Sequence, residues 1–411
     1  FSLTSTIHPG AAELDRFASQ SSDEELRAFW IGHIPVALIR GVLALANNPT
    51  VHEKTRLTEF WSKNPAAPST ELLKQWKATF DEAAALRLSA PSLEQLPRVT
   101  KVLDDFERKL AEGGTTAVAV YDQFELLGVY DVDIRRRFIR ALLAAWISLS
   151  NRYKRIRAKI FLGEDLFDSR WLNFPDASKL RPRAESLRWD VPSLYRAVVR
   201  HFAAAGEPTR RWLREVPGLD LRDLGDFGWM PGDVPDDVQR AFIERFTRRM
   251  MGTGIQKTYA HRWIPNQLQD GKGRIMPRMM LNLLGTAARE AMYRARTGRD
   301  QRLVEPEDLL AALQETSTRR AQEVRPEYPW IDVLQTLHGR EAPFKREEFL
   351  LRIGTLTELP PGVQPRDAEA VLDDLLQLGV LRIDHDGRVD VPDIYRYFYG
   401  IRRTGGAAHT A

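Results

Sequence analysis

The chain has 411 residues, of which 43% are hydrophobic and 28% charged, a composition that excludes a disordered or fibrous protein and allows two or three globular domains. Its 60 basic and 56 acidic residues leave a net charge of +4, which permits contact with nucleic acid without indicating it. The sequence has no cysteine, which excludes disulfides and thiolate zinc sites.

The most apolar stretch, residues 31–46, contains His33 and Arg40 and is too short to span a bilayer. We therefore expect no transmembrane helix and no membrane partner. Together with the lack of cysteine, this pattern favours a cytoplasmic location. The first ten residues show no signal-peptide pattern and resemble the end of a strand, so we expect the chain to begin inside a domain.

A short apolar run at residues 117–121 gives the first strand signal and ends at Asp122. Apolar side chains in successive positions predict a strand buried on both faces, as in a parallel sheet covered by helices. Two further strands are predicted at 157–162 and 185–189, and an amphipathic helix at 134–151 separates the first two. This alternation predicts a parallel sheet with right-handed crossovers.

Asp122 is a candidate metal ligand and catalytic residue, because open α/β sheets bind ligands at the carboxyl ends of their strands. In P-loop nucleotidases an Asp at this position holds the Mg²⁺ that bridges nucleotide phosphates. Glu125 is a second catalytic candidate, or it caps or pairs with the next helix. Gln123 follows Asp122 directly and cannot accept a proton, so Mg²⁺ binding is better supported than fast hydrolysis. The alternative is that Asp122 only caps the strand in solvent.

The sequence contains no Gly-x-x-x-x-Gly-Lys-[Ser/Thr] phosphate loop, and the nearest string, Gly271-Lys272-Gly273, lacks its spacing and a preceding strand. After the second strand, Asp165 either senses the γ-phosphate of a nucleotide or caps a turn. The basic clusters at 135–137, 181–183 and 210–211 are solvated faces or supply an arginine finger to a neighbouring subunit. The sequence does not choose between these alternatives.

Helices dominate beyond residue 203, and three are predicted at 236–251, 277–296 and 306–323. Pro277 suits a first helical turn because it has no N–H to leave unpaired. Arg278 adds positive charge at the same helix N-terminus, so the two residues form a candidate anion site, with Arg274 as the substitute if the helix is rotated. The alternative is an ordinary helix start with surface arginines.

Near the C-terminus, helices at 346–354 and 366–378 precede two alternating strands that flank Asp384-His385-Asp386-Gly387. An Asp-Gly pair between alternating runs predicts a hairpin turn, and helices followed by a hairpin are typical of a winged-helix domain. The hairpin positions predicted to face the core are Leu381, Ile383, Val389 and Val391. The second helix is acidic, which suits a protein surface better than DNA phosphates.

The order of these motifs resembles bacterial ATPases of the AAA+/STAND group, P-loop ATPases found in stress, signalling and phage-defence loci. The resemblance extends over roughly residues 115–402 and rests on Val118 to Glu125, Lys159-Ile-Phe-Leu-Gly-Glu-Asp-Leu-Phe, Asp176-Ala-Ser-Lys-Leu with Leu187-Arg-Trp189, Gly273 to Arg278, and Pro392-Asp-Ile-Tyr-Arg-Tyr. Two departures are the missing phosphate loop and Gly163, which stands where a charged residue is expected.

The resemblance implies a mixed α/β, mostly helical protein: a parallel-sheet nucleotidase core truncated at its N-terminus (1–202), a helical lid (203–335) and a winged helix (336–411). It implies ATP and Mg²⁺ as cofactors, with Asp122 as the magnesium ligand and Arg278 as a phosphate sensor. The implied function is an ATP-dependent switch or weak, regulated ATPase, homo-oligomeric or bound to an effector protein in a bacterial defence or signalling assembly. The alternative is a non-catalytic winged-helix protein that binds DNA or a protein partner.

Overall fold

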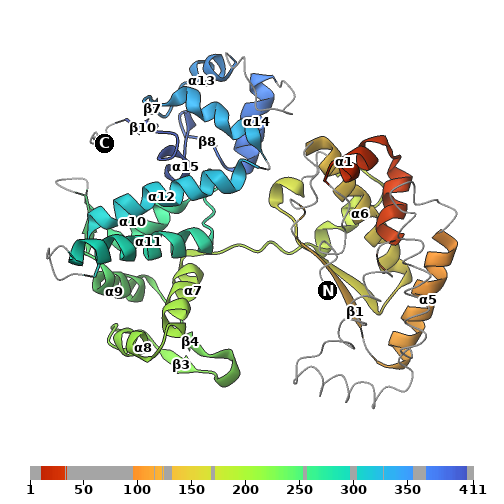
Figure 1. Ribbon diagram of the computed structural model, residues 1–411, viewed down its shortest axis with the longest axis horizontal. Helices are drawn as coiled ribbons and strands as arrows, with labels where there is room; N and C mark the ends of the chain where they lie inside the picture. The colour runs from red at the N-terminus through yellow and green to blue at the C-terminus, as the bar shows by residue number, and fades with distance from the viewer. Residues whose placement is uncertain are drawn as a thin grey trace. The chain divides into compact units, whose positions relative to one another are not determined.

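The computed structural model describes residues 11–32, 34, 96–114, 116–122, 124, 132–167, 172–252, 257–296, 303–326, 328–354 and 367–404. The chain divides into two compact units, Phe1–Glu185 (unit 1) and Ser186–Ala411 (unit 2) (Figure 1). The division precedes the helix that starts at Val191, whereas the sequence predicted a first boundary at residue 202. That helix contacts other elements of unit 2.

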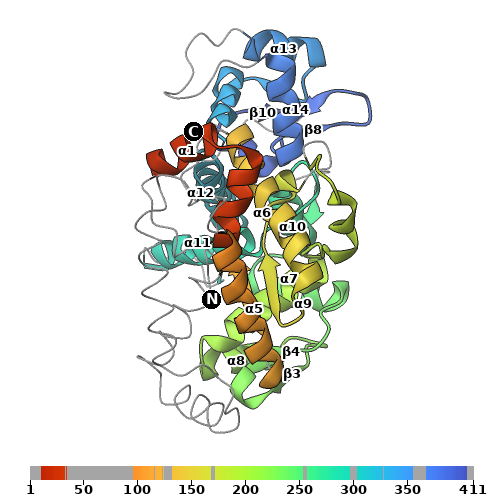
Figure 2. The same cartoon turned by 90° about the vertical axis from the view of Figure 1, so that its right-hand side faces the viewer.

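Unit 1 packs helices against a pair of strands. Its elements are α1 (Ala11–Gln20), a helical segment at residues 23–32, α5 (Leu96–Glu112), β1 (Ala117–Tyr121), α6 (Val132–Arg152), β2 (Ile156–Ile160), and the 3₁₀ turns η4 (Glu164–Leu166), η5 (Ala177–Lys179) and η6 (Arg181–Arg183). In Figure 2, α5 and α6 run beside the strands.

The predicted pairing of the first two strands is confirmed. β1 and β2 are parallel neighbours, in register from Ala117 opposite Ile156 to Tyr121 opposite Ile160. The connection between them contains α6, as a parallel pair requires, because its crossover must return the chain to the same end of the sheet.

The predicted burial of β1 on both faces is wrong. Ala119 and Tyr121 are buried at 1% exposure, whereas Val118 is 37% exposed. Side chains alternate across a strand, so one face of the pair packs on the core of unit 1 and the other is open. The run of apolar residues concealed this alternation because Val118 and Val120 are as hydrophobic as their buried neighbours.

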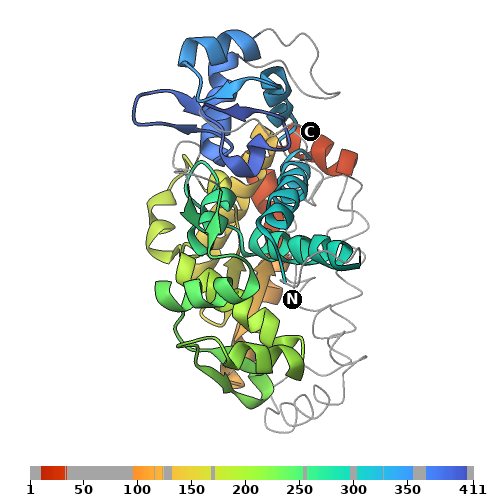
Figure 3. The same cartoon turned by 90° about the vertical axis from the view of Figure 1, so that its left-hand side faces the viewer.

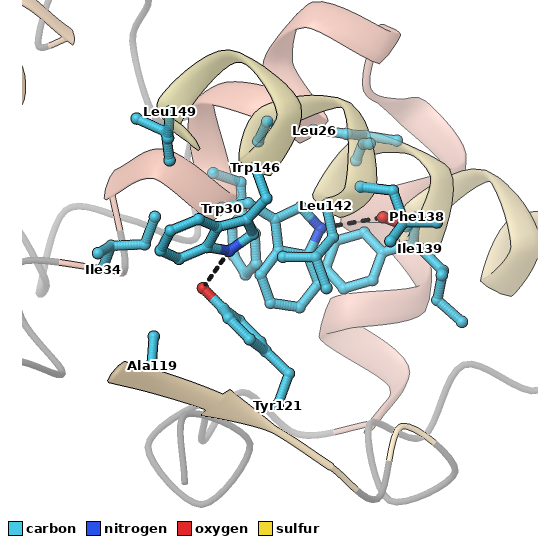
Figure 4. Close-up of a cluster of buried hydrophobic side chains, with 14 of the residues drawn as sticks. Leu26, Trp30, Ile34, Ala119, Tyr121, Phe138, Ile139, Leu142, Trp146 and Leu149 are labelled. Atoms are coloured by element: carbon cyan, nitrogen blue, oxygen red, sulfur yellow. Dashed lines mark hydrogen bonds between the residues drawn. The ribbon is translucent and has the colours of Figure 1, made fainter. Parts of the chain in front are cut away.

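The core of unit 1 is rich in aromatic side chains (Figure 4). Trp30 and Phe138 pack with ring centroids 4.5 Å apart, and the Trp30 indole donates a hydrogen bond to the Phe138 carbonyl at 2.9 Å. Tyr121 meets Trp30 edge-on at 5.9 Å. These contacts bring the segment at 23–32, α6 and β1 together, although they are far apart in the sequence.

The predicted third strand at 185–189 is not a strand. Residues 184–190 form no helix or strand and are all exposed. Asp190 instead begins a helix, because its side chain accepts a hydrogen bond from the backbone N–H of Ser193 and Pro192 occupies the first turn. A strand needs a neighbour to satisfy its backbone groups, and none of the described strands pairs with this segment.

Unit 2 is mostly helical with small two-stranded sheets (Figure 3). Its elements are α7 (Val191–Ala204), α8 (Glu207–Arg214), β3 (Leu221–Asp223), η7 (Gly225–Phe227), β4 (Trp229–Pro231), α9 (Asp236–Phe246), β5 (Met250–Met251), β6 (Thr258–Tyr259), α10 (Ala260–Leu268), α11 (Pro277–Arg296), α12 (Pro306–Val324), η9 (Pro329–Leu337), β7 (Glu341–Ala342), α13 (Arg346–Ile353), α14 (Ala368–Leu378), β8 (Arg382–Ile383), β9 (Val389–Asp390), α15 (Asp393–Arg396) and β10 (Arg402–Arg403).

The three helices predicted in the middle of unit 2 are present as α9, α11 and α12, but α9 ends at Phe246 rather than 251. The chain leaves the helix there because Met250 and Met251 pair with Tyr259 and Thr258 in a short antiparallel sheet. The β3–β4 hairpin was not predicted either. The sequence missed both sheets because their strands have only two or three residues each, too few for a visible alternation.

The predicted C-terminal hairpin is confirmed. β8 and β9 pair antiparallel, and Gly387 takes a φ of 79° in the turn, which favours glycine. Leu381, Val389 and Val391 are buried as predicted, but Ile383 is 45% exposed. Ile383 pairs with Val389, which also exchanges backbone hydrogen bonds with Phe344 at 2.8 Å, so β9 lies between two neighbours whereas Ile383 is on the outer strand.

Among the described residues, no helix combines the length and apolar character needed to cross a membrane.

Candidate functional site

The candidate site lies where β1 and β2 end together. Tyr121 is opposite Ile160, and the next residue of β2, Phe161, donates its N–H to the Tyr121 carbonyl at 2.9 Å. Asp122 follows directly and is exposed. The structure therefore places this carboxylate at the carboxyl edge of a parallel pair, beside the segment that leaves the neighbouring strand.

Tyr121 fixes the backbone immediately before Asp122. Its ring is 1% exposed, and its hydroxyl accepts a hydrogen bond from the Trp146 indole at 2.9 Å (Figure 4). Burial raises the pKa of the Tyr121 phenol, so the group stays neutral at ordinary pH. An aromatic anchor of this kind holds the strand end in one position, and the exposed carboxylate then projects from a rigid base.

Glu107 positions the start of β2, and the sequence analysis did not identify it. Its carboxylate accepts hydrogen bonds from the backbone N–H groups of Lys154, Arg155 and Ile156 at 2.6 to 3.0 Å. These donors would otherwise be unpaired at the turn between α6 and β2. Glu107 is one of several acidic residues on α5, so no local signal distinguishes it.

A second contact from α5 holds the end of α6. Asp104 accepts two hydrogen bonds from the Arg152 guanidinium, at 3.0 and 2.7 Å, and a third from the Tyr153 hydroxyl at 3.0 Å. The bonds from Arg152 lower the pKa of Asp104 and outweigh the opposing effect of burial. Together with Glu107, this pair ties α5 to the chain entering β2 and so sets the register of the strand pair.

Two other predicted site residues lie wholly or partly outside the described part of the chain. Glu125, the second catalytic candidate, lies outside the described residues, as does Gln123. The backbone of Asp165 belongs to η4, immediately after β2, but its side chain lies outside the description. The roles predicted for Glu125 and Asp165 therefore stay predictions.

Arg274 of unit 2 has structural partners. Its Nε donates to Asp270 Oδ2 at 2.7 Å, and its Nη2 donates to the Leu378 carbonyl at 2.8 Å. The Leu378 carbonyl is at the C-terminus of α14, where the helix offers acceptors without intrahelical donors and partial negative charge. Arg274 thus links the loop before α11 to the end of α14.

The same loop approaches α14 closely at two glycines. The Gly271 N–H donates to the Gly379 carbonyl at 2.6 Å, and a Cβ at Gly271 would meet the Leu381 carbonyl oxygen at 2.0 Å. Only glycine permits this approach. The Gly271-Lys272-Gly273 string, which does not match a phosphate loop in sequence, therefore forms part of a joint between two helices.

Pro277 is the first residue of α11, as predicted. Arg278 follows in the first turn, where its side chain is 76% exposed and its Nη1 lies 3.5 Å from Glu323 Oε1. An exposed ion pair at this distance contributes little, so the guanidinium is accessible to another anion. Asp122 and Arg278 belong to different units, whose relative positions are not determined.

The structure assigns packing roles to most of the basic clusters. Arg137 and Arg140 of α6 both bind Asp23, at 2.6 and 2.8 Å, and Arg210 binds Glu207 at 2.9 Å within α8. Arg137 and Arg140 hold α6 against the segment at 23–32, and Arg210 also donates to the Ala203 carbonyl of α7 at 3.1 Å. The sequence predicted that these clusters are solvated faces or supply an arginine finger, and the contacts of Arg137 and Arg210 do not distinguish the two.

Asp122 is the carboxylate that the structure describes directly at the end of β1, and Glu164 is exposed in η4 just after β2. Within the described ranges, no group of three or more His, Asp or Glu side chains gathers to hold a metal ion. Mg²⁺ is the cation that suits such a site, since it keeps several waters and needs only one or two carboxylates when substrate phosphates supply further oxygens. No protein-family model, curated protein or solved structure matches the chain.

Proposed function

We propose that this chain is an ATP-dependent molecular switch in which Asp122 holds the Mg²⁺ of Mg–ATP. The observation that carries the proposal is the position of Asp122 on a rigid strand end, beside the exit of a parallel neighbour. Ligands of open α/β sheets bind in this place. The aromatic anchor below Asp122 supports the proposal, because metal binding needs a carboxylate held in a fixed position.

Slow or regulated hydrolysis fits the sequence next to Asp122. The neighbour is Gln123, whose amide cannot accept a proton from the attacking water. The chain would therefore bind ATP more readily than it hydrolyses it, which suits a switch whose nucleotide state persists. The order of motifs that resembles the AAA+/STAND group supports a role in a bacterial defence or signalling assembly.

Unit 2 would read the nucleotide state. Arg278 is exposed in the first turn of α11, where its guanidinium and the positive end of the helix dipole suit phosphate oxygens. Through the loop at 270–274, α11 is joined to α14 and the β8–β9 hairpin. We propose that these C-terminal elements are a winged helix. We also propose that phosphate binding or release at Arg278 shifts them through the loop at 270–274.

The exchange of Asp122 for Asn tests the proposal. Removing the charge should weaken Mg²⁺-dependent ATP binding by the full protein roughly tenfold or more, because the phosphate-bound cation loses its carboxylate. Binding of a fluorescent ATP analogue is measured with Mg²⁺ and with excess EDTA. The matched control is Asp105→Asn, which removes a carboxylate of α5 that pairs with Arg108 in the same helix.

The expected result is a Mg²⁺-dependent affinity in the wild type and in the Asp105→Asn variant, and its loss in the Asp122→Asn variant. All three proteins should show the same far-ultraviolet circular dichroism. Equal ATP affinity and equal Mg²⁺ dependence in the wild type and the Asp122→Asn variant would contradict the proposal.

The composition of α14 bears on the alternative function, in which a non-catalytic winged helix binds a partner. The second helix of the pair, α14, carries Glu369 and Asp373 and has no basic residue. Such a helix repels DNA phosphates, so this alternative concerns a protein partner rather than DNA. It predicts that the full protein binds its partner with the same affinity whether or not ATP and Mg²⁺ are present.

A further inference from the structure

The β1–β2 sheet of unit 1 has one open face. Ala119 and Tyr121 point from β1 to the core, which covers the other face (Figure 4). Because side chains alternate across a strand, Val118 and Val120 lie on the open face, where Val118 is 37% exposed. Arg157 of β2 pairs with Val118 and lies on the same face. The open face therefore consists of two neighbouring columns of side chains, one from each strand.

The β2 column of the open face is basic. Arg157 and Lys159 are exposed, and each lies opposite a valine of β1. Arg155 extends the column, because the Ala117 N–H donates to the Arg155 carbonyl at 2.8 Å and the intervening Ile156 is buried. Alternate residues of a strand are about 6.6 Å apart, so the three cations form a line.

The charge of this column is not neutralised by neighbouring carboxylates. No Asp or Glu occurs between residues 154 and 163. Within the described part of the chain, Arg155, Arg157 and Lys159 form no ion pair. A line of cations without such partners attracts an anion that carries several charges in a row.

Phe161 ends the basic column with an aromatic ring. It lies two positions after Lys159, and its N–H donates to the Tyr121 carbonyl at 2.9 Å, so it continues the alternation of the strand. The ring is 44% exposed, and no other ring of the described residues packs on it. The column therefore offers a flat apolar surface for stacking at the end of a cationic line.

The two columns fit a ligand that is anionic along one side and apolar along the other. Single-stranded nucleic acid has this form, because it carries a phosphate charge on every nucleotide and exposes the flat faces of its bases. Successive phosphates of an extended strand are spaced like alternate residues of β2, which leaves the bases over Val118, Val120 and the Phe161 ring. A duplex fits less well, since its bases stack on one another. A membrane surface needs several large apolar side chains, and Phe161 is the one that the described strands present on this face.

We propose that the open face of the β1–β2 sheet binds single-stranded nucleic acid with little preference for sequence. The phosphates contact Arg155, Arg157 and Lys159, and one base stacks on Phe161. Backbone contacts and stacking read no base edge, so the sequence preference is weak. This inference goes beyond the proposed function and does not rest on it. Arg155 is at the amino end of β2, whereas Asp122 stands at the carboxyl end of the sheet.

Binding to an exposed cationic face weakens as the salt concentration rises. For single strands, the logarithm of the association constant falls with the logarithm of the salt concentration, with a slope of about −0.7 per phosphate contact. The three basic side chains therefore predict a slope of roughly −2. Fluorescence anisotropy of a short labelled oligothymidylate, titrated with the full chain at several salt concentrations without ATP or Mg²⁺, measures this slope.

Removing the charge and removing the ring should have different effects. Arg155→Gln with Arg157→Gln should weaken binding at low salt and make the slope less negative by about 1.4. Phe161→Leu keeps an apolar side chain but no ring, so it should weaken binding roughly tenfold without changing the slope. Phe161→Trp should keep the wild-type affinity or raise it, because an indole also stacks on bases.

The charge control is Lys101→Gln with Arg108→Gln. Both side chains are exposed on α5, and α5 contributes Leu103 and Phe106 to the core that covers the other face of the sheet. This variant loses the same charge and should keep the affinity and the slope of the wild type. A duplex of the same sequence should bind to the wild type more weakly than the single strand.

A wild type that binds no single strand at low salt overturns the proposal. So does a slope that is equal in the wild type and the Arg155→Gln, Arg157→Gln variant, or an equal affinity for duplex and single strand. Vesicles of phosphatidylserine that displace the oligonucleotide would assign the face to a membrane and overturn it as well. Mg²⁺-dependent ATP binding should be unchanged in the double variant, so a failure of the ATP site and a failure of this inference are told apart.

Discussion

Unit 1 and unit 2 hold their elements in place by different interactions. In unit 1 the strand pair packs on aromatic rings, and the main polar groups inside that core, the indole groups of Trp30 and Trp146 and the hydroxyl of Tyr121, bond to one another or to the backbone. The carboxylates Asp104 and Glu107 act at the edge of this core, where α5 meets the chain entering β2.

In unit 2, buried carboxylates hold the ends of helices and strands. Asp270 is 6% exposed and binds Arg274 between α11 and α14. Asp308 is 7% exposed, accepts the Glu305 N–H at 2.7 Å and binds Arg294 at 2.5 Å, so it caps α12 and ties it to α11. A buried charge of this kind is stable only with its partner in place.

The difference has a physical consequence for each unit. Apolar packing depends on shape and area, so a core of rings tolerates changes of pH and salt but not the loss of volume. Ion pairs at helix ends are directional, so they fix how α11, α12 and α14 meet, and they fail when one partner is removed. We therefore expect unit 1 to be most sensitive to truncation of an aromatic ring and unit 2 to removal of a charge.

The largest effect should come from Trp30→Ala. Trp30 is fully buried, and its loss leaves a cavity and removes the bond to the Phe138 carbonyl. We expect the free energy of unfolding of unit 1 to fall by about 4 kcal/mol, measured by urea unfolding of the full chain. The matched control is Trp189→Ala, at a ring that is 47% exposed, which should change stability by less than about 0.5 kcal/mol. Equal losses in the two variants would contradict the comparison.

The second effect should come from Asp270→Ala in unit 2. The change leaves the Arg274 guanidinium without its carboxylate and removes the acceptor for the Lys272 and Arg274 N–H groups. We expect the free energy of unfolding to fall by about 2 to 3 kcal/mol. This value is at or below the low end of the range for a broken buried pair, because the Arg274 side chain is 30% exposed. The control is Asp386→Ala, at the hairpin turn, where Arg388 and Asp386 pair at the surface. A negligible loss for Asp270→Ala would show that packing alone holds the joint.

The smallest effect should be a pH dependence of the free energy of unfolding of unit 2. His261 is 2% exposed, and burial lowers its pKa, although its contact with Asp236 at 3.2 Å opposes the shift. The unfolded chain then binds a proton more readily than the folded one, so unit 2 should lose stability as the pH falls below about 6.5. Unfolding at pH 7.5 and 5.5 measures this loss.

His261→Gln should remove that part of the pH dependence, since the amide can still bond to Asp236 and does not titrate. His385→Gln is the control, because His385 is exposed at the hairpin turn, and it should keep the slope of the wild type. If the His261→Gln variant loses the same stability as the wild type between the two pH values, another group is responsible.

The confirmed sequence predictions share one property, which is that their signal is local. The β1–β2 pair follows from two apolar runs separated by a helix, the start of α11 at Pro277 follows from the chemistry of proline, and the hairpin turn at 384–388 follows from an Asp-Gly pair. In each case residues that are close in the sequence favour one backbone conformation. The position of Asp122 at a strand end follows from the same local pattern.

The sequence predictions are wrong where a segment has a clear local pattern but no other element packs against it in the fold. Residues 185–189 have strand-like composition, but none of the described strands lies beside them, and the chain uses Asp190 to begin α7. Val118 is more hydrophobic than Ala119, yet Ala119 faces the core and Val118 is exposed. Burial depends on what packs against a residue, which a single sequence does not state.

The sequence by itself determined where the longer helices, the β1–β2 pair and the C-terminal hairpin lie, and that an acidic residue stands at the end of β1. Only the tertiary structure decided that Glu107 supports β2, that Arg274 binds Asp270 and the end of α14, and that Phe161 stands exposed on the open face of the β1–β2 sheet. Glu107 and Arg274 bond to residues about 50 and 100 positions away in the chain. Contacts over such separations form only after folding has brought the elements together, because the local sequence carries no trace of the partner.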